Sequence, residues 1–289
     1  MSHEPVREIA TTTVTAVAEA PAVLDAAAEE SIARVRVAGA PVSVVDMDKV
    51  LDTFGQWVGS GRDRVVLLRD VHGAMCARKN DLVREAQEAA ELVLPDGVPL
   101  TWAARLAGQS GISRVCGIDL LPRVCRHGVT RQWRHFFYGA SPNVADQLAV
   151  IMREQFPGIA IVGTHCPPFR PLTADEDAEI CAKIREAKPD FVWVSLSTPK
   201  QDLWMQEHRG RLGGVTMIGV GGAFEINAGL ISRAPMWMQR SGLEWLYRLA
   251  QEPGRLWKRY FECLPRFAVL ATLELIKQRL APVISSRNP

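Results

Sequence analysis

Several aspartates stand where a strand is expected to end or a helix to begin, which are positions where a carboxylate can do chemistry. Asp96 lies in the turn Pro95-Asp96-Gly97 directly after an apolar run. A carboxylate there can take a proton from an attacking hydroxyl group if the two come within hydrogen-bonding distance. The spacing alone favours a turn or helix N-cap role over that of a base.

Two further acidic groups have the spacing of metal ligands. Asp46 and Asp48 form a DxD pattern, which could hold a divalent cation, and residues 175–177 read Asp-Glu-Asp. Both groups coincide with predicted helix starts, where acidic residues cap the helix or interact with its dipole. The six cysteines form no CxxC pair, which indicates reduced thiols of a cytosolic protein. We therefore expect no metal and no cofactor.

Glycine turns follow three of the predicted strands. They contain Gly139 with Ser141, Gly163, and Gly221 with Gly222. Glycine lets the backbone approach a ligand, and the N–H groups of a following helix can bind a phosphate. Tight packing of helix on strand explains the same glycines equally well.

One more polar turn opens a helix directly after a strand. Thr198 precedes Pro199, and Lys200 and Gln201 follow it, so their side chains could reach a phosphate or a base. The chain contains neither GxxxxGKS/T nor GxGxxG, so a P-loop NTPase and an ordinary dinucleotide dehydrogenase are not expected.

The elements that position these residues alternate between strand and helix. Apolar runs predict strands at residues 42–45, 65–68, 92–94, 135–138, 159–162, 191–196 and 215–220. Helical patterns cover residues 48–59, 81–90, 99–107, 119–126, 142–156, 174–187 and 199–208. This alternation predicts an α/β fold with a mostly parallel sheet and helices on both faces. Ligands bind such sheets at the carboxyl ends of the strands.

The two ends of the chain differ from this core, which we place at residues 36–230. Residues 1–35 lack a clear period and are expected to form a flexible arm. Residues 231–289 predict a helical appendage with helices at 237–249, 255–262 and 266–280, separated by Pro253 and Pro265.

The appendage is basic, with ten Lys/Arg against four acidic residues. Basic helices that also carry Trp and Phe favour a membrane interface, although a helix packed on the main domain is the alternative. No apolar stretch is long enough to span a bilayer, and no signal peptide is evident.

Several strings together resemble one known family. Residues 219–229, 233–239, 242–249 and 252–260 are similar in order and content to the WecG/TagA/CpsF glycosyltransferases. The similarity extends upstream to residues 95–97, 113–119, 139–142 and 199–201, and it covers about residues 40–262.

This resemblance implies a Rossmann-like core and an inverting hexosyltransferase. It implies a UDP-sugar donor carrying a hexose or N-acetylhexosamine and a polyprenyl-diphosphate-linked acceptor. The reaction would serve exopolysaccharide or cell-envelope polysaccharide synthesis, at the cytoplasmic face of the cell membrane and on its anionic surface. Nucleic acid is not an expected partner, because the basic tail carries no recognised binding motif. The tail could equally form an interface in a homo-oligomer.

The resemblance also assigns roles to single residues. Asp96 matches the proposed general base, Arg114 a motif arginine suited to diphosphate charge, and Gln201 the glutamine after Pro-Lys. Asn227 lies in the matched string beside Gly221 and Gly222. The basic residues of the appendage are expected to contact diphosphate or membrane; they are Arg233, Arg248, Arg255, Lys258 and Arg259.

One departure from the family pattern leaves alternatives open. Members often carry Thr-x-Asn after the second strand, where this chain has Leu68-Arg69-Asp70. Asp70 therefore becomes a second candidate base, which His72 could assist. The same departure is the only support for an alternative function, a non-catalytic nucleotide-sugar-binding component of a polysaccharide assembly complex.

Overall fold

The computed structural model describes residues 32–285, except for the side chains of Arg255 and residues 278–285. The proposed arm therefore lies outside the described residues up to position 31. A strand begins at Arg34, so folded structure starts slightly before residue 36. Residues from Ile32 onward form one compact unit.

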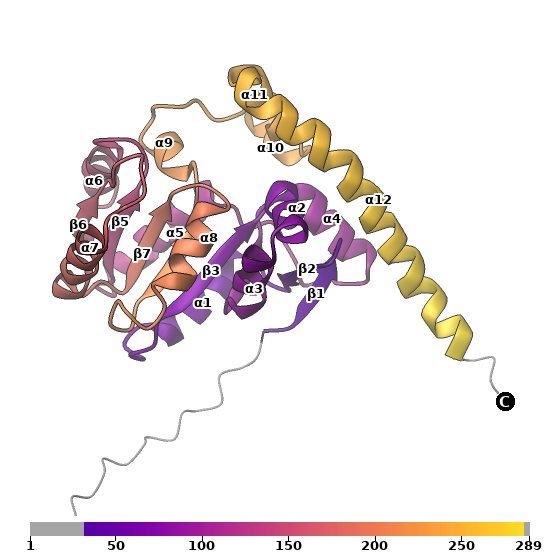
Figure 1. Cartoon of the computed structure of the whole chain (residues 1–289), viewed down its shortest axis with the longest axis horizontal. Helices are drawn as coiled ribbons and strands as arrows, with labels where there is room; N and C mark the ends of the chain where they lie inside the picture. The colour runs from indigo at the N-terminus through magenta and orange to yellow at the C-terminus, as the bar shows by residue number, and fades with distance from the viewer. Residues whose placement is uncertain (1–31, 286–289) are drawn as a thin grey trace, which may run out of the picture. The chain divides into compact units, whose positions relative to one another are not determined.

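Six strands of the described chain form one sheet in which every pair is parallel. The strand order is β4-β3-β8-β7-β5-β6. The bounds are β3 (Arg64–Arg69), β4 (Leu92–Pro95), β5 (Arg134–Gly139), β6 (Ala160–His165), β7 (Phe191–Ser195) and β8 (Thr216–Gly219). This confirms the predicted α/β fold with a parallel sheet (Figure 1).

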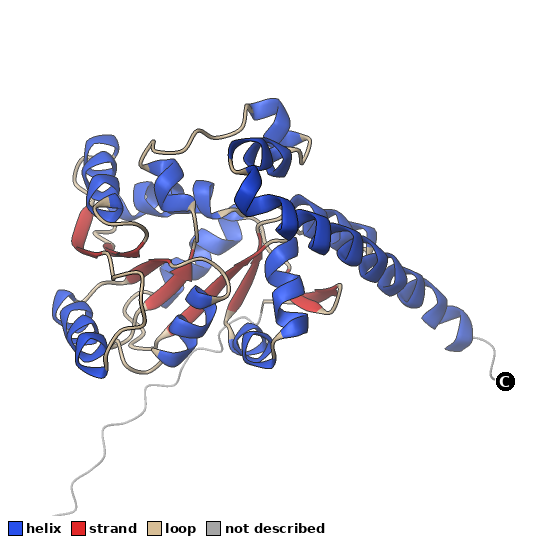
Figure 2. Ribbon diagram, turned by 45° about the horizontal axis from the view of Figure 1, so that its top comes forward, coloured by secondary structure: helices blue, strands red, loops and turns tan. Residues whose placement is uncertain are grey.

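Helices cover both faces of this sheet, as Figure 2 shows. Successive residues of a strand point to opposite faces, so Val66 and Leu68 join one core cluster while Val65 and Leu67 join another. The first cluster includes side chains of α1 (Met47–Trp57), α5 (Gly117–Val129), α6 (Val144–Gln155) and α9 (Ala223–Asn227). The second includes side chains of α7 (Ala174–Ala187) and α8 (Lys200–Glu207).

A third core cluster lies beside the β4 edge of the sheet. It contains the antiparallel hairpin of β1 (Arg34–Val37) and β2 (Ala40–Ser43), together with α2 (Val71–Lys79) and α4 (Val98–Leu106). Helix α3 (Asp81–Ala89) packs on α2 and α8. The predicted strand at 42–45 is thus part of a hairpin and not of the main sheet.

The appendage consists of α10 (Met236–Arg240), α11 (Glu244–Gln251) and α12 (Pro253–Ser285). The expected single helix at 237–249 is wrong, because the chain turns at Gly242 with a positive φ of 73°. The expected break at Pro265 is also wrong. The helix continues because Leu256, Cys263 and Phe267 lie on one buried face, and packing outweighs the hydrogen bond lost at proline.

Helix α2 was not predicted. It has little amphipathic pattern because it is covered on more than one side, by α3 and by α12. Its first turn is fixed by Asp70, whose carboxylate accepts a hydrogen bond from the Gly73 amide at 2.8 Å. In Figure 1, α12 runs past α2 and α4, which places the appendage beside the carboxyl ends of β3 and β4.

Candidate active site

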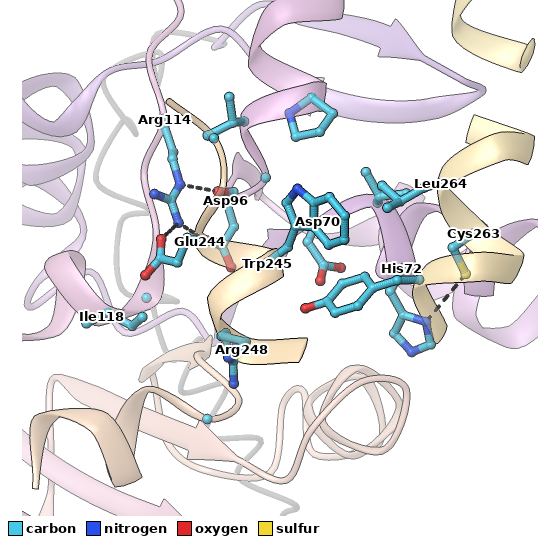
Figure 3. A pocket seen from close by; sticks show the side chains of 18 of the residues that line it. Asp70, His72, Asp96, Arg114, Ile118, Glu244, Trp245, Arg248, Cys263 and Leu264 are labelled. Atoms are coloured by element: carbon cyan, nitrogen blue, oxygen red, sulfur yellow. Dashed lines mark hydrogen bonds and ion pairs between the residues drawn. The ribbon is translucent and has the colours of Figure 1, made fainter. Parts of the chain in front are cut away.

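Two adjoining pockets lie at the carboxyl ends of β3, β4, β7 and β8. The first, which we call the apolar pocket, lies between the core and the appendage and is lined by Val71, Val98, Pro99, Trp245, Tyr260 and Leu264 among others (Figure 3). The second, which we call the polar pocket, is lined by Ser141, Thr198, Gln201, Gly221, Glu225 and Arg259 among others. Asp70, Asp96, Gly222 and Arg248 line both pockets. These shared residues mark the junction where two ligands could meet.

Asp96 lies at this junction because the chain turns sharply after β4. The amides of Asp96 and Gly97 both donate to the carbonyl of Arg69, at 2.9 and 3.1 Å, so the turn is fixed to the end of β3. A Cβ at Gly97 would lie 3.1 Å from the Cα of Asp70, which explains the glycine. Burial raises the pKa of Asp96 to about 6 against the opposing charge of Arg114, and the carboxylates of Asp70 and Glu244 add to the rise.

Asp70 is the other carboxylate at the junction, and its environment differs. It caps α2 and forms an ion pair with Arg259 of α12. Burial alone would raise the pKa of Asp70, but the Arg259 guanidinium and the Gly73 amide outweigh burial and hold it below its usual value. His72 lies nearby, and its ring nitrogens contact the sulfur atoms of Cys76 at 3.5 Å and Cys263 at 3.8 Å.

Arg114 connects the core to the appendage. Its Nε donates to the backbone carbonyl of Asp96 at 2.6 Å, and its Nη2 donates to Glu244 of α11 at 2.7 Å. The carboxylate of Asp96 is farther from Nη2, at 3.8 Å. Glu244 also accepts from Arg233, which pairs with Asp119 at 2.5 Å. The matched strings at 113–119, 233–239 and 242–249 are therefore joined by one ion-pair network.

Arg248 differs from these arginines. It lines both pockets, and within the described part of the chain it makes no hydrogen bond or ion pair. A Cβ at Gly222 would come within 3.2 Å of its Nη2, so the glycine leaves room for the guanidinium. Arg248 is consequently a half-buried positive charge that faces the pockets, and its nearby charge opposes the rise in the pKa of Asp96.

Gln201 organises one wall of the polar pocket. Its side chain is buried, and its carbonyl oxygen accepts a hydrogen bond from the Gly221 amide at 3.0 Å. Gly221 has a positive φ of 53°, and the loop it forms separates β8 from α9. Thr198 lies within 3.5 Å of the Gln201 amide nitrogen and also lines the pocket.

Four residues predicted to bind substrate line neither pocket. Lys200 is exposed at the start of α8, and the Asn227 side chain donates to the backbone of Ile118 at 3.2 Å. A Cβ at Gly139 would meet the Ser195 carbonyl at 2.5 Å, so this glycine allows β5 to pack closely on β7. Gly163 lies within β6 beside the Phe136 ring, and the predicted strand end at residue 162 is wrong.

The remaining basic residues of the appendage are distributed differently. Arg233 belongs to the ion-pair network, and Arg259 lies between Asp70 and the polar pocket. Lys258 is exposed, with its Nζ 5.7 Å from the centroid of the Trp257 ring. The side chain of Arg255 lies outside the described residues.

Several site residues were not singled out from the sequence. Trp245 and Tyr260 pack edge to face in the wall of the apolar pocket, with ring centroids 5.4 Å apart. Below the junction, fully buried Arg69 pairs with Asp202 at 2.9 Å and joins β3 to α8. Both aromatic residues lie in strings that resemble the family, and this resemblance was the sequence signal by which they could have been found. Nothing in the local pattern distinguished Arg69 and Asp202 from surface charges.

The acidic groups with metal-like spacing have other partners. The carboxylate of Asp46 caps α1 by accepting from the Lys49 amide at 2.9 Å, and Glu176 forms a capping box with Thr173. Among the described residues, one group of side chains has its ligand atoms within 4.8 Å of one another: Asp177, Cys181 and His208. It lines neither pocket, and Asp177 already pairs with His208 and Arg211.

Within the described chain, none of the helices combines the length and apolar character that crossing a membrane would need. The model of the WecG/TagA/CpsF glycosyl transferase family matches residues 35–281. An N-acetylglucosaminyldiphosphoundecaprenol N-acetyl-β-D-mannosaminyltransferase of Bacillus spizizenii is 30% identical over 191 residues, which is 66% of this chain and 72% of the relative. The protein of the same name from Bacillus subtilis is 29% identical over 201 residues, 70% of this chain and 76% of the relative. The chain therefore belongs to the WecG/TagA/CpsF family and is a glycosyltransferase.

Proposed function

We propose that this enzyme transfers a hexose or N-acetylhexosamine from a UDP-sugar to a polyprenyl-diphosphate-linked acceptor, with inversion at the anomeric carbon. The reaction would belong to exopolysaccharide or cell-envelope polysaccharide synthesis. The names of the two Bacillus relatives support a diphosphate-linked lipid as the class of acceptor. That the transferred sugar is a hexose or an N-acetylhexosamine is the more specific part of the proposal.

The observation that carries this proposal is the junction of the two pockets. A polar pocket suits the nucleotide diphosphate of a donor, and an apolar pocket between core and appendage suits a lipid-linked acceptor. Asp96 and Arg248 lie where the two would meet, which is where a base and a positive charge are needed.

Asp96 would act as the base. The hydroxyl oxygen of the acceptor attacks the anomeric carbon, the bond from that carbon to the diphosphate oxygen breaks, and the acceptor proton passes to Asp96. With a pKa near 6, Asp96 is ionised at neutral pH but more basic than an ordinary aspartate. Asp70 is less suited, because Arg259 and the Gly73 amide stabilise its charged form.

The leaving diphosphate would be stabilised from the polar pocket. Arg248 makes no hydrogen bond or close ion pair among the described residues, and Arg259 could exchange Asp70 for a phosphate. The Gly221–Gly222 loop and the hydroxyls of Ser141 and Thr198 would add hydrogen bonds. Arg114 is already paired, so we assign it the role of fixing the Asp96 turn to α11.

The appendage would hold the enzyme on the inner, anionic face of the cell membrane. Helix α12 exposes large apolar side chains, which include Trp257, Phe261, Leu273 and Ile276, and it carries basic residues between them. Such a helix can lie in the interface without crossing the bilayer. We propose that the appendage begins at residue 231.

A product assay tests the proposal. The full-length chain is incubated with a panel of UDP-hexoses and UDP-N-acetylhexosamines and a polyprenyl-diphosphate-linked sugar, and products are analysed by mass spectrometry. We expect one donor to add a single sugar to the acceptor. Donor binding without transfer to any acceptor would contradict the proposal and favour the non-catalytic nucleotide-sugar-binding component.

A further inference from the structure

A third cavity lies outside the two pockets, in a groove between α2 and α12 (the α2–α12 groove). Its lining is mostly apolar and includes Met75 of α2 and Cys263, Pro265, Val269 and Leu270 of α12. Val269 is 59% exposed, so this apolar surface is open to a ligand and is not only core. None of the roles assigned above uses this groove.

The groove adjoins the apolar pocket. Cys263 lines both cavities, and its sulfur lies 3.8 Å from the ring of His72, which also lines the apolar pocket (Figure 3). From Cys263 to Leu270 the helix rises about 10 Å, at roughly 1.5 Å per residue. The groove therefore extends from the site and follows α12 away from Asp96.

The charges around the groove lie at its rim. Arg78, Lys79 and Arg266 border it, and the one acidic residue among its lining, Glu262, is 3.5 Å from Lys79. An apolar floor with a cationic rim does not suit a sugar or a nucleotide. It suits a hydrocarbon chain that runs toward anionic lipid headgroups.

We propose that the α2–α12 groove binds the first isoprene units of the acceptor's polyprenyl chain, while the diphosphate and sugar lie at the junction beside Asp96 and Arg248. The inference rests on the proposed function, since it requires a lipid-linked acceptor. It assigns α12 two roles: the groove side selects the acceptor by its chain, and other exposed side chains contact the membrane.

The test compares Val269→Asp with Leu273→Asp. Both residues are exposed on α12, at 59% and 50%, but only Val269 lines the groove. The full-length variants are assayed in detergent with two acceptors that share one sugar diphosphate, one with a long polyprenyl chain and one with a short alkyl chain.

We expect the wild type to have a lower KM for the long-chain acceptor. Val269→Asp should raise that KM about tenfold, which corresponds to lost burial of roughly two methylene groups, and leave the short-chain KM unchanged. Leu273→Asp should change neither KM. Vesicle flotation should weaken for Leu273→Asp, which lies outside the groove, and stay close to wild type for Val269→Asp, which lines it.

The outcomes separate the two proposals. No transfer by the wild type to either acceptor would refute the proposed function itself. Transfer with equal KM for both acceptors, or equal effects of the two substitutions on the long-chain KM, would refute the groove while leaving the proposed function intact. Circular dichroism of both variants checks that the fold is retained.

Discussion

The polar and apolar pockets are assembled in different ways. The polar pocket is built largely by short motifs at the ends of neighbouring core strands, such as the Gly221–Gly222 loop after β8. The apolar pocket requires segments that are far apart in sequence, since Arg114 and Glu244, which both line it, are separated by 130 residues. The appendage adds Arg248 and Arg259 to the polar pocket, so we expect donor binding to depend on the core loops together with these two arginines. Acceptor binding and transfer should depend more strongly on how the appendage contacts the core.

The largest effect is expected at the junction. Asp96→Asn should lower kcat by about 10²–10⁴-fold, the usual contribution of a general base, while UDP-sugar affinity stays close to wild type. Donor binding by calorimetry and turnover with the lipid acceptor measure the two quantities. Asp70→Asn is the matched control, for which we expect a smaller loss of kcat because Asp70 positions Arg259 and α2. A larger loss of kcat for Asp70→Asn than for Asp96→Asn would indicate that Asp70 is the base and that Asp96 has the positioning role.

Arg248→Gln should reduce kcat/KM for the donor by about 10- to 100-fold, the range for losing a hydrogen bond to a charged group. The free energy of unfolding should stay near wild type, because Arg248 has no ion-pair partner among the described residues. Steady-state kinetics and urea denaturation test both parts. A clear loss of stability with unchanged kinetics would show that Arg248 serves the fold and not the donor.

Glu244→Ala should act mainly on stability. The substitution removes the carboxylate that Arg114 and Arg233 share, so two half-buried guanidinium groups each lose an ion-pair partner. We expect a loss of about 1–2 kcal/mol, below the value for a fully buried pair because both arginines are partly exposed to water. Urea denaturation measures the loss, and limited proteolysis should show earlier cleavage within α10 and α11. Unchanged stability would mean that this network does not hold the appendage.

The sequence predicted the parallel sheet, because its strands are short apolar runs buried on both faces. It placed Asp96, Gly221 and Gly222 correctly after strand ends, and Gln201 at the start of the helix that follows a strand, where local spacing is informative. It failed for α2 and for the continuity of α12 through Pro265, since both depend on contacts between distant segments. Gly139 and Gly163 show a related limit, because a glycine required for packing has the same local pattern as one that admits a ligand.

The Glu244–Arg114 and Asp70–Arg259 pairs could not be predicted for a further reason. A charged residue on a helix is usually solvated, and a partner more than a hundred residues away leaves no local signal. The family resemblance located the strings that carry these residues, but it did not pair them. The two-pocket arrangement therefore emerges only from the structure.

The pH dependence of kcat/KM tests the central assignment most directly, because burial raises the pKa of Asp96 to about 6. A base must be deprotonated, so kcat/KM should fall about tenfold per pH unit below that value and level off above it. Since the folded-state pKa exceeds the unfolded one, the same group should make the free energy of unfolding decrease as pH rises from about 4 to 6. The account predicts that the pH profile of kcat/KM has an acidic limb near pH 6 in the wild type, and that this limb is absent from the residual activity of Asp96→Asn. If kcat/KM of both proteins fell at the same pH, Asp96 would not be the base.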